Sequence, residues 1–106
     1  MIEKIRNAAN NLANELIAIR RHLHKYPELS YQEKNTALFI CEQLDKYNIS
    51  YSKNIGGHGI VALIHGKNPS SKTIAIRGDM DALPIQEQND KEYASCMPGV
   101  MHACGH

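Results

Sequence analysis

The sequence predicts an α/β fold in which two helices precede a set of strands. Two stretches before residue 48 repeat apolar residues every three or four positions, which is the period of an amphipathic helix. After residue 48 the chain instead contains short apolar runs bounded by glycine, asparagine and proline, a pattern typical of strands and turns. With 106 residues, the chain has room for one small domain.

The first helix is expected over residues 1–26, which contain neither glycine nor proline. It should end before Pro27, because the residue preceding a proline disfavours helical geometry. The tail of this helix, residues 20–25, is cationic and suits either the negative end of the helix dipole or an anionic substrate group. His22 and His24 are two positions apart and cannot share a helix face, which argues against a metal-binding pair. The apolar positions are Ile5, Ala9, Leu12, Leu16, Ile19 and Leu23.

The second helix is predicted to begin at a capping box, Ser30 to Glu33. In that motif the serine hydroxyl binds the amide three residues on, and the glutamate carboxylate returns to the serine amide. Asn48 is a plausible residue for the C-terminal stop. Cys41 lies on the apolar stripe of this helix and is interpreted as a small core residue. That stripe comprises Ala37, Ile40, Cys41, Leu44 and Tyr47.

Three strands should follow. Residues 49–53 alternate in polarity, whereas residues 60–64 are almost wholly apolar, as expected of a central strand covered on both faces. The glycines at 56–59 predict a turn rather than a phosphate-binding loop, because no helix follows them. Residues 72–76 form the second buried strand. Asp79 and Asp81 come just after it, where ligands usually lie in α/β sheets.

Composition and charge exclude several functions. A net charge of +1 gives no electrostatic basis for binding nucleic acid or an anionic membrane. No apolar run approaches the ~20 residues that span a bilayer. The first residues lack the pattern of a signal peptide, and three cysteines are an odd number for a disulfide framework. The cytoplasm is therefore the expected compartment.

The last residues carry a candidate metal site. His102, Cys104 and His106 alternate, so an extended backbone would direct all three side chains to one side. Thiolate and imidazole are ligands for zinc and other transition metals. Asp79 and Asp81 alternate in the same way; they either cap turn amides or orient a metal-bound histidine.

These motifs occur together in one order, and the series resembles the M20 metallopeptidase family. More specifically, the series looks like the amidohydrolase branch of that family, which contains N-acyl-amino-acid amidohydrolases, hippurate hydrolases and plant auxin-conjugate hydrolases. The resemblance runs from about residue 5 to residue 106. The segments that carry it are Arg21–His24, Pro27–Ser30, Gly56–Gly57, Arg77–Glu87 and Pro98–His106.

The resemblance implies a site and a fold. Cys104 and His106 match the two ligands of the family's Cys-Gly-His motif, in a centre of two divalent ions (Mn, Zn, Co or Ni). Asp81 matches the aspartate that orients a metal-binding histidine. Asp79 stands where other M20 branches have a histidine ligand and is not assigned as one; His102 has no ligand role in this branch. The implied fold is the N-terminal part of a zinc-peptidase-like catalytic domain of two or three layers.

The implied activity is hydrolysis of the amide bond of N-acyl amino acids by the complete protein. The family's general base, its further ligands and its dimerisation domain follow the Cys-Gly-His motif. Residues 1–106 are thus expected to be the N-terminal portion of the catalytic domain, to bind metal weakly and to be inactive alone. The resemblance is also compatible with a homo-oligomer. The alternatives are a catalytically dead interaction module that pairs through unpaired strand edges, and a redox pair of Cys96 and Cys104, which lacks Cys-x-x-Cys spacing.

Overall fold

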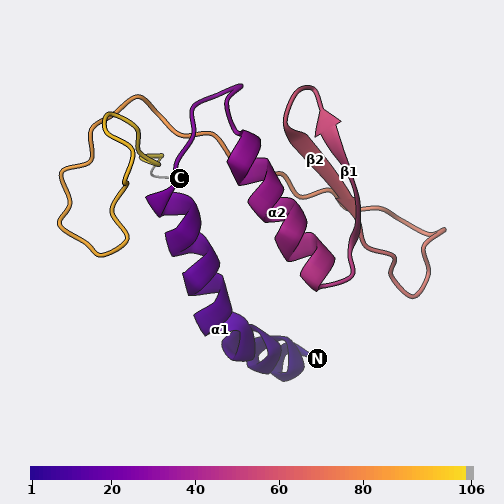
Figure 1. Cartoon of the computed structure of the whole chain (residues 1–106). Helices are drawn as coiled ribbons and strands as arrows, with labels where there is room; N and C mark the ends of the chain where they lie inside the picture. The colour runs from indigo at the N-terminus through magenta and orange to yellow at the C-terminus, as the bar shows by residue number, and fades with distance from the viewer. Residues whose placement is uncertain (105–106) are drawn as a thin grey trace.

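The computed structural model describes residues 1–104 and contains two helices followed by two antiparallel strands (Figure 1). The helices are α1 (Ile2–Lys25) and α2 (Lys34–Lys46), and the strands are β1 (Ser50–Ile55) and β2 (Gly59–Leu63). Helix α2 lies between α1 and the β1–β2 hairpin. The predicted order of two helices and then strands is confirmed.

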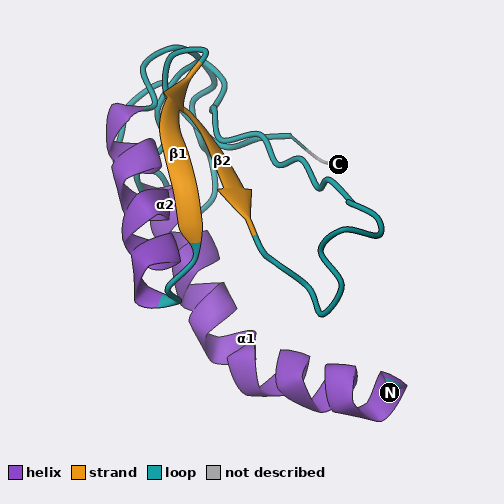
Figure 2. Cartoon of the chain, turned by 90° about the vertical axis from the view of Figure 1, so that its right-hand side faces the viewer, coloured by secondary structure: helices purple, strands orange, loops and turns teal. Residues whose placement is uncertain are grey.

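Helix α1 ends where the sequence predicts, with the amide of Tyr26 bonded to the carbonyl of His22 at 3.1 Å. No residue of this helix is buried, and its first half extends away from the other elements (Figure 2). The expected apolar stripe is present in the sequence, but it is largely open to solvent within the described part of the chain. Helix α1 contacts α2 through a few other side chains. His22 stacks on Phe39 with ring centroids 3.9 Å apart, and Lys46 pairs with Glu15 at 2.5 Å.

The start of α2 differs from the predicted capping box. Ser30 makes no cap, and the helix begins at Lys34, because a turn with Tyr31 at φ 66° intervenes. The carboxylate of Glu28 caps the helix instead. Its two oxygens accept hydrogen bonds from the amide and side chain of Thr36, at 2.5 and 2.7 Å, and from those of Asn35, at 3.2 and 3.1 Å. Glu28 therefore satisfies two of the amides that a helix N-terminus leaves free.

The end of α2 and the hairpin follow local sequence signals. Asn48 adopts a left-handed φ of 54° just past the helix, which confirms it as the stop, and Cys41 is buried as predicted. The predicted turn is also confirmed, with Gly56 and Gly57 at φ 60° and 115°. A Cβ atom at Gly59 would collide with the carbonyl oxygen of Ile55, its partner across the hairpin.

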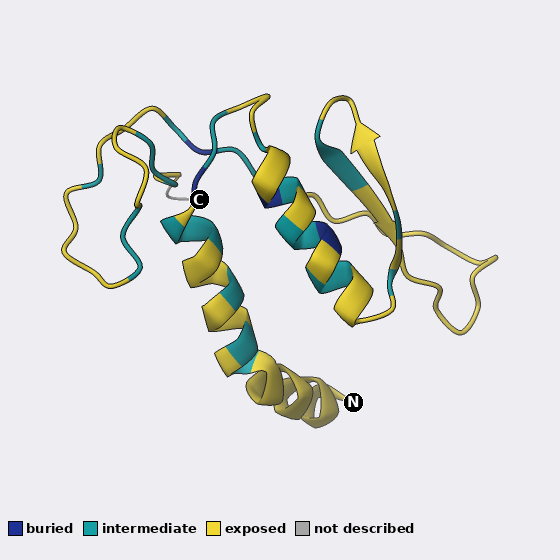
Figure 3. Ribbon diagram, in the orientation of Figure 1, coloured by how far each residue is buried: buried dark blue, intermediate teal, exposed yellow. Residues whose placement is uncertain are grey.

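Two predicted buried strands are not buried. Strand β2 leaves Val61 and Leu63 exposed, and residues 72–76 form no strand within residues 1–104. Ile74 and Ile76 are 88% and 96% exposed. A strand needs a neighbour for its backbone hydrogen bonds and a layer over its apolar face. Within residues 1–104, the segment 72–76 pairs with no strand, and Figure 3 shows the loop after β2 as exposed. The prediction of a covered strand here was wrong for this chain.

Two isolated β-bridges join segments that are distant in the sequence. Leu29 pairs with Ala82 in parallel, and the amide of Ala82 donates to the carbonyl of Glu28 at 2.8 Å. Leu83 pairs with Met101 in antiparallel fashion through two hydrogen bonds of 2.9 and 3.0 Å. Ala82 is among the few buried residues. These bridges bring residues 28–30, 81–83 and 101 side by side. Neither described helix has the length and hydropathy needed to cross a membrane.

Candidate metal centre

Asp81 and Cys104 line one hollow of about 740 Å³. Asp81 and Cys104 come together because the antiparallel bridge between Leu83 and Met101 holds residues 81–83 beside the residues that follow Met101. We call this space the Asp81–Cys104 hollow. It is lined by Arg77, Gly78, Asp79, Asp81, Leu83, His102 and Cys104.

Asp81 is held by a neighbour that is distant in sequence. The hydroxyl of Ser30 donates to Oδ2 of Asp81 at 2.5 Å. This hydrogen bond is the main reason that the pKa of Asp81 lies below its ordinary value. The backbone amide of Asp81 lowers this pKa further, burial opposes the shift, and the nearby His102 and Arg77 side chains make smaller contributions that lower it. The side chain is therefore a carboxylate at neutral pH and attracts cations.

Asp79 is engaged differently. Its Oδ1 accepts from Nε of Arg77 at 3.1 Å and lies 2.9 Å from Nη2 of the same guanidinium. Both side chains are exposed, so the pair adds little to stability. Arg77 thus partly neutralises Asp79, and the two aspartates of the motif differ in their partners.

His102 and Cys104 both line the hollow, as expected of alternate residues in an extended segment. The pKa of His102 is lowered by burial first, then by the nearby His24, while Asp81 opposes this. The rings of His102 and His24 are 6.5 Å apart. Nε2 of His102 is buried and has no hydrogen-bond partner in the described structure. His102 is therefore a neutral imidazole near pH 7 with one nitrogen available.

The donor atoms suit a divalent transition metal, although they do not complete a site. Cys104 is an exposed free thiol, and Asp81 supplies negative charge to the same hollow. Among residues 1–104, no group of three or more His, Cys, Asp or Glu side chains could hold a metal ion. His106, the other predicted ligand, lies outside the described residues. Cys104 thus fits the role of one ligand that needs further donors.

Comparisons with known proteins found one matching family model and several similar proteins. The model of peptidase family M20/M25/M40 matches residues 75–106, the stretch that contains Asp81, Cys104 and His106. The putative amidohydrolase YhaA of Bacillus subtilis is 47% identical over 104 residues, covering 98% of this chain and 26% of that protein. The N-acyl-L-amino acid amidohydrolase of Geobacillus stearothermophilus is 46% identical, covering 98% and 28%. Residues 75–106 of the chain thus match the M20 family, and nearly the whole chain is similar in sequence to amidohydrolases.

Two solved structures share the fold of this chain. A putative aminohydrolase from methicillin-resistant Staphylococcus aureus superimposes with a TM-score of 0.91 at 41% identity, over 99% of this chain and 28% of that one. The YXEP protein of Bacillus subtilis, described as a dinuclear metal-binding peptidase of the M20 family, gives a TM-score of 0.83 at 42% identity, over 91% and 27%. The chain spans about a quarter of the length of the relatives it matches.

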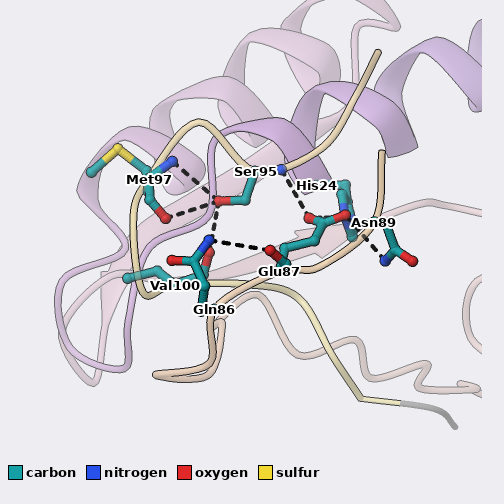
Figure 4. Close-up of polar contacts among 7 residues, drawn as sticks. All are labelled: His24, Gln86, Glu87, Asn89, Ser95, Met97 and Val100. Atoms are coloured by element: carbon teal, nitrogen blue, oxygen red, sulfur yellow. Dashed lines mark hydrogen bonds and ion pairs between the residues drawn. The ribbon is translucent and has the colours of Figure 1, made fainter. Parts of the chain in front are cut away.

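One polar cluster, which the sequence did not predict, joins the end of α1 to residues 86–96 (Figure 4). His24 Nε2 lies 2.9 Å from Oε1 of Glu87, whose side chain is only 4% exposed. The amide of Ser95 donates to the same oxygen at 2.9 Å, and Asn89 donates to Oε2 at 3.2 Å. The Ser95 amide is the first cause of a lowered pKa at Glu87; burial opposes it, and His24 and Asn89 add to it.

No local signal could have found this cluster, since 63 positions separate His24 from Glu87. The cluster also clarifies the cationic tail of α1. Arg21 lies over the ring of Tyr93 at 4.6 Å, so part of the tail packs against the 86–96 segment. His22 turns toward α2 and His24 toward Glu87, in keeping with the prediction that the two histidines form no metal-binding pair.

Proposed function

We propose that residues 1–106 form part of the catalytic domain of a metal-dependent amidohydrolase that acts on N-acyl amino acids. The observation that carries this proposal is the presence of Asp81 and Cys104 on one hollow. The two residues fall in separate stretches, Arg77–Glu87 and Pro98–His106, in which the sequence resembles the M20 family. Their approach depends on the Leu83–Met101 bridge. Neither motif alone would specify such a site.

The roles proposed for the chain's residues follow from their chemistry. Cys104, as a thiolate, and His106 are ligands of a two-metal centre (Mn, Zn, Co or Ni). When bound, two divalent ions activate a water molecule and polarise an amide carbonyl. Asp81 orients a histidine ligand through its carboxylate. Its lowered pKa keeps it ionised and able to accept that hydrogen bond.

The proposed substrate class is a small N-acyl amino acid. Support comes from the names of the relatives, which include an N-acyl-L-amino acid amidohydrolase and the N-acetyldiaminopimelate deacetylase of Enterococcus faecalis, 48% identical over 93 residues. The proposal of two metal ions is supported by the description of the YXEP protein as dinuclear. Absence of nucleic-acid or membrane partners, and a cytoplasmic location, stay predictions from the sequence.

A chimera tests the proposed function. Residues 1–106 would replace the aligned region of the Geobacillus stearothermophilus N-acyl-L-amino acid amidohydrolase, to which they are 46% identical. Hydrolysis of N-acetyl and N-benzoyl amino acids would be measured with added Mn²⁺ or Zn²⁺. We expect metal-dependent turnover by the chimera and none by the isolated chain. The matched variant Cys104→Ala of the chimera should lose activity.

Two results would contradict the proposal. A chimera that folds, as judged by circular dichroism, but hydrolyses none of the substrates would show that this chain cannot supply its share of the site. A Cys104→Ala chimera with full activity would remove the thiol from the proposed metal centre. Turnover by the isolated chain would refute the expectation that it is inactive alone.

A second candidate function is a catalytically dead interaction module, favoured by the exposed Ile74 and Ile76. An extended apolar segment with free backbone groups is a template for pairing with another chain. If it pairs with a second copy, sedimentation velocity should detect a dimer at micromolar concentrations, and Ile76→Lys should shift it to monomer. Ile2→Lys, an exposed isoleucine at the start of α1, is the matched control. A chain that is monomeric at all concentrations would argue against this function.

A further inference from the structure

Ser30 contacts Asp81 across 51 positions of sequence, although its sequence context predicts a helix cap. The distance of 2.5 Å from Oγ to Oδ2 lies at the short end of the range for a hydroxyl that donates to an ionised carboxylate. Ser30 contributes nothing to the start of α2, which Glu28 caps. The hydroxyl is therefore committed to Asp81 rather than to the helix.

Backbone pairing sets this contact in place. The carbonyl of Glu28 accepts from the amide of Ala82, and Leu29 pairs with Ala82 in a parallel bridge. Residues 28–30 thus run beside residues 81–82, so the side chains of Ser30 and Asp81 approach each other. Ala82 is buried, and this limits movement of the pair.

The same short segment is anchored at its other side. The carboxylate of Glu28 binds the amides of Asn35 and Thr36 at the start of α2, and Thr36 is itself buried. Helix α2 therefore fixes residues 28–30 through Glu28. The position of Ser30 is set by the fold, even though its own side chain is exposed.

We propose that Ser30 is a positioning residue, which holds the carboxylate of Asp81 in one orientation at the Asp81–Cys104 hollow. A carboxylate rotates readily about its last side-chain torsion, and a hydrogen bond to one oxygen restricts that rotation. The consequence for metal binding rests on the proposed function, in which Asp81 orients a histidine ligand. The contact between Ser30 and Asp81 itself does not depend on that function.

Three substitutions at Ser30 test the inference on the full 106-residue chain. Ser30→Ala removes the hydroxyl. Ser30→Val and Ser30→Thr have nearly the same shape and differ in that hydroxyl, so they separate hydrogen bonding from packing. Ser70→Ala is the control, because Ser70 donates to Asn68 in an exposed loop far along the chain. Circular dichroism would establish that each variant is folded.

Two readouts are needed. In the metal-free chain, ¹³C NMR follows the titration of the Asp81 carboxyl, whose midpoint should rise in Ser30→Ala and Ser30→Val. With Co²⁺ as the probe, thiolate-to-cobalt absorption at pH 7 gives a dissociation constant, which should rise about tenfold in the same two variants, as for other groups that support a metal ligand. Ser30→Thr and Ser70→Ala should resemble the unmodified chain in both measurements.

The outcomes separate this inference from the proposed function. An unchanged Asp81 signal in Ser30→Ala and Ser30→Val would overturn the positioning role. So would an unchanged Co²⁺ affinity, if the unmodified chain binds the ion. Absence of any thiolate band from the unmodified chain at saturating Co²⁺ would overturn the assignment of Cys104 as a metal ligand. A shifted Asp81 titration would still support the hydrogen bond from Ser30 to Asp81.

Discussion

Cys104→Ser is expected to abolish the thiolate-to-cobalt absorption of the chain and to weaken Co²⁺ binding more than 100-fold. Loss of a group that only supports a ligand costs 10–100-fold, and loss of the ligand itself should cost more. A serine hydroxyl is a hard, protonated oxygen and replaces a thiolate poorly as a ligand for such metals. Cys104 is an exposed, free thiol that lines the Asp81–Cys104 hollow, so the ion can reach it.

Cys96→Ser is the matched control for this prediction. Cys96 is also an exposed free thiol, but it does not line the hollow. Its replacement should leave the Co²⁺ spectrum unchanged. Equal losses from the two substitutions would point to nonspecific thiol binding or to the alternative of a redox pair. A Cys104→Ser chain with an intact spectrum would exclude Cys104 as a ligand.

Glu28→Ala is expected to lower the free energy of unfolding by about 2 kcal/mol, the upper part of the range for loss of a helix cap. The Glu28 carboxylate accepts hydrogen bonds from the amides and side chains of Asn35 and Thr36. Without it, the amide of the buried Thr36 would lose its partner. For a chain of about 100 residues, the melting temperature should fall by about 10 °C. Urea unfolding and thermal melts measure both quantities.

The same contact predicts a pH dependence. Partial burial alone would raise the pKa of Glu28, but the hydrogen bonds from Thr36 and Asn35 outweigh it and hold the pKa below its ordinary value of 4.5. A lowered folded-state pKa stabilises the fold fully above the unfolded-state pKa, and this stabilisation is lost as the pH falls through the folded-state pKa. The difference in stability between the unmodified chain and Glu28→Ala should therefore be constant near pH 7 and shrink below about pH 4.

Glu42→Ala provides the control, since Glu42 is an exposed glutamate on the same helix. It should change stability by less than about 0.5 kcal/mol, as is usual for surface positions. If Glu28→Ala were no more destabilising than Glu42→Ala, the cap would contribute nothing. A pH-independent loss in Glu28→Ala would mean that packing, rather than the charge of Glu28, is responsible.

Local features of the fold were predictable because short stretches of backbone decide them. Pro27 limits α1 for steric reasons, and Asn48 tolerates the left-handed conformation that ends α2. The glycines at 56 and 57 supply the positive φ angles of the hairpin turn. Each of these effects acts over a few neighbouring residues, so the sequence contains all the information needed.

The cap of α2 was not predictable from local sequence, because two different side chains are near enough to cap it. Ser30 and Glu33 match a capping box, yet Glu28 reaches the helix amides from two residues before that motif and Ser30 binds Asp81 instead. A helix start can be satisfied by any nearby acceptor, and the path of the turn selects among them. That path depends on the Leu29–Ala82 bridge, which joins segments about 50 positions apart.

Exposure of residues 72–76 has a different cause. Alternating and apolar patterns report which residues a strand would bury, but not whether another strand is available to cover them. Within residues 1–104 none pairs with this segment, so Ile74 and Ile76 face solvent. Their apolar character was read correctly from the sequence, and their burial was not.

By itself, the sequence determined the helix boundaries set by Pro27 and Asn48, the glycine turn and the motifs that resemble those of the M20 family, because these depend on residue type at fixed short spacings. Only the tertiary structure decided which distant groups meet: Ser30 with Asp81, His24 with Glu87, and Asp81 with Cys104 on one hollow. Those meetings follow from backbone bridges between remote segments. Such pairing is a property of the whole packed chain, and no single stretch of it encodes the partner.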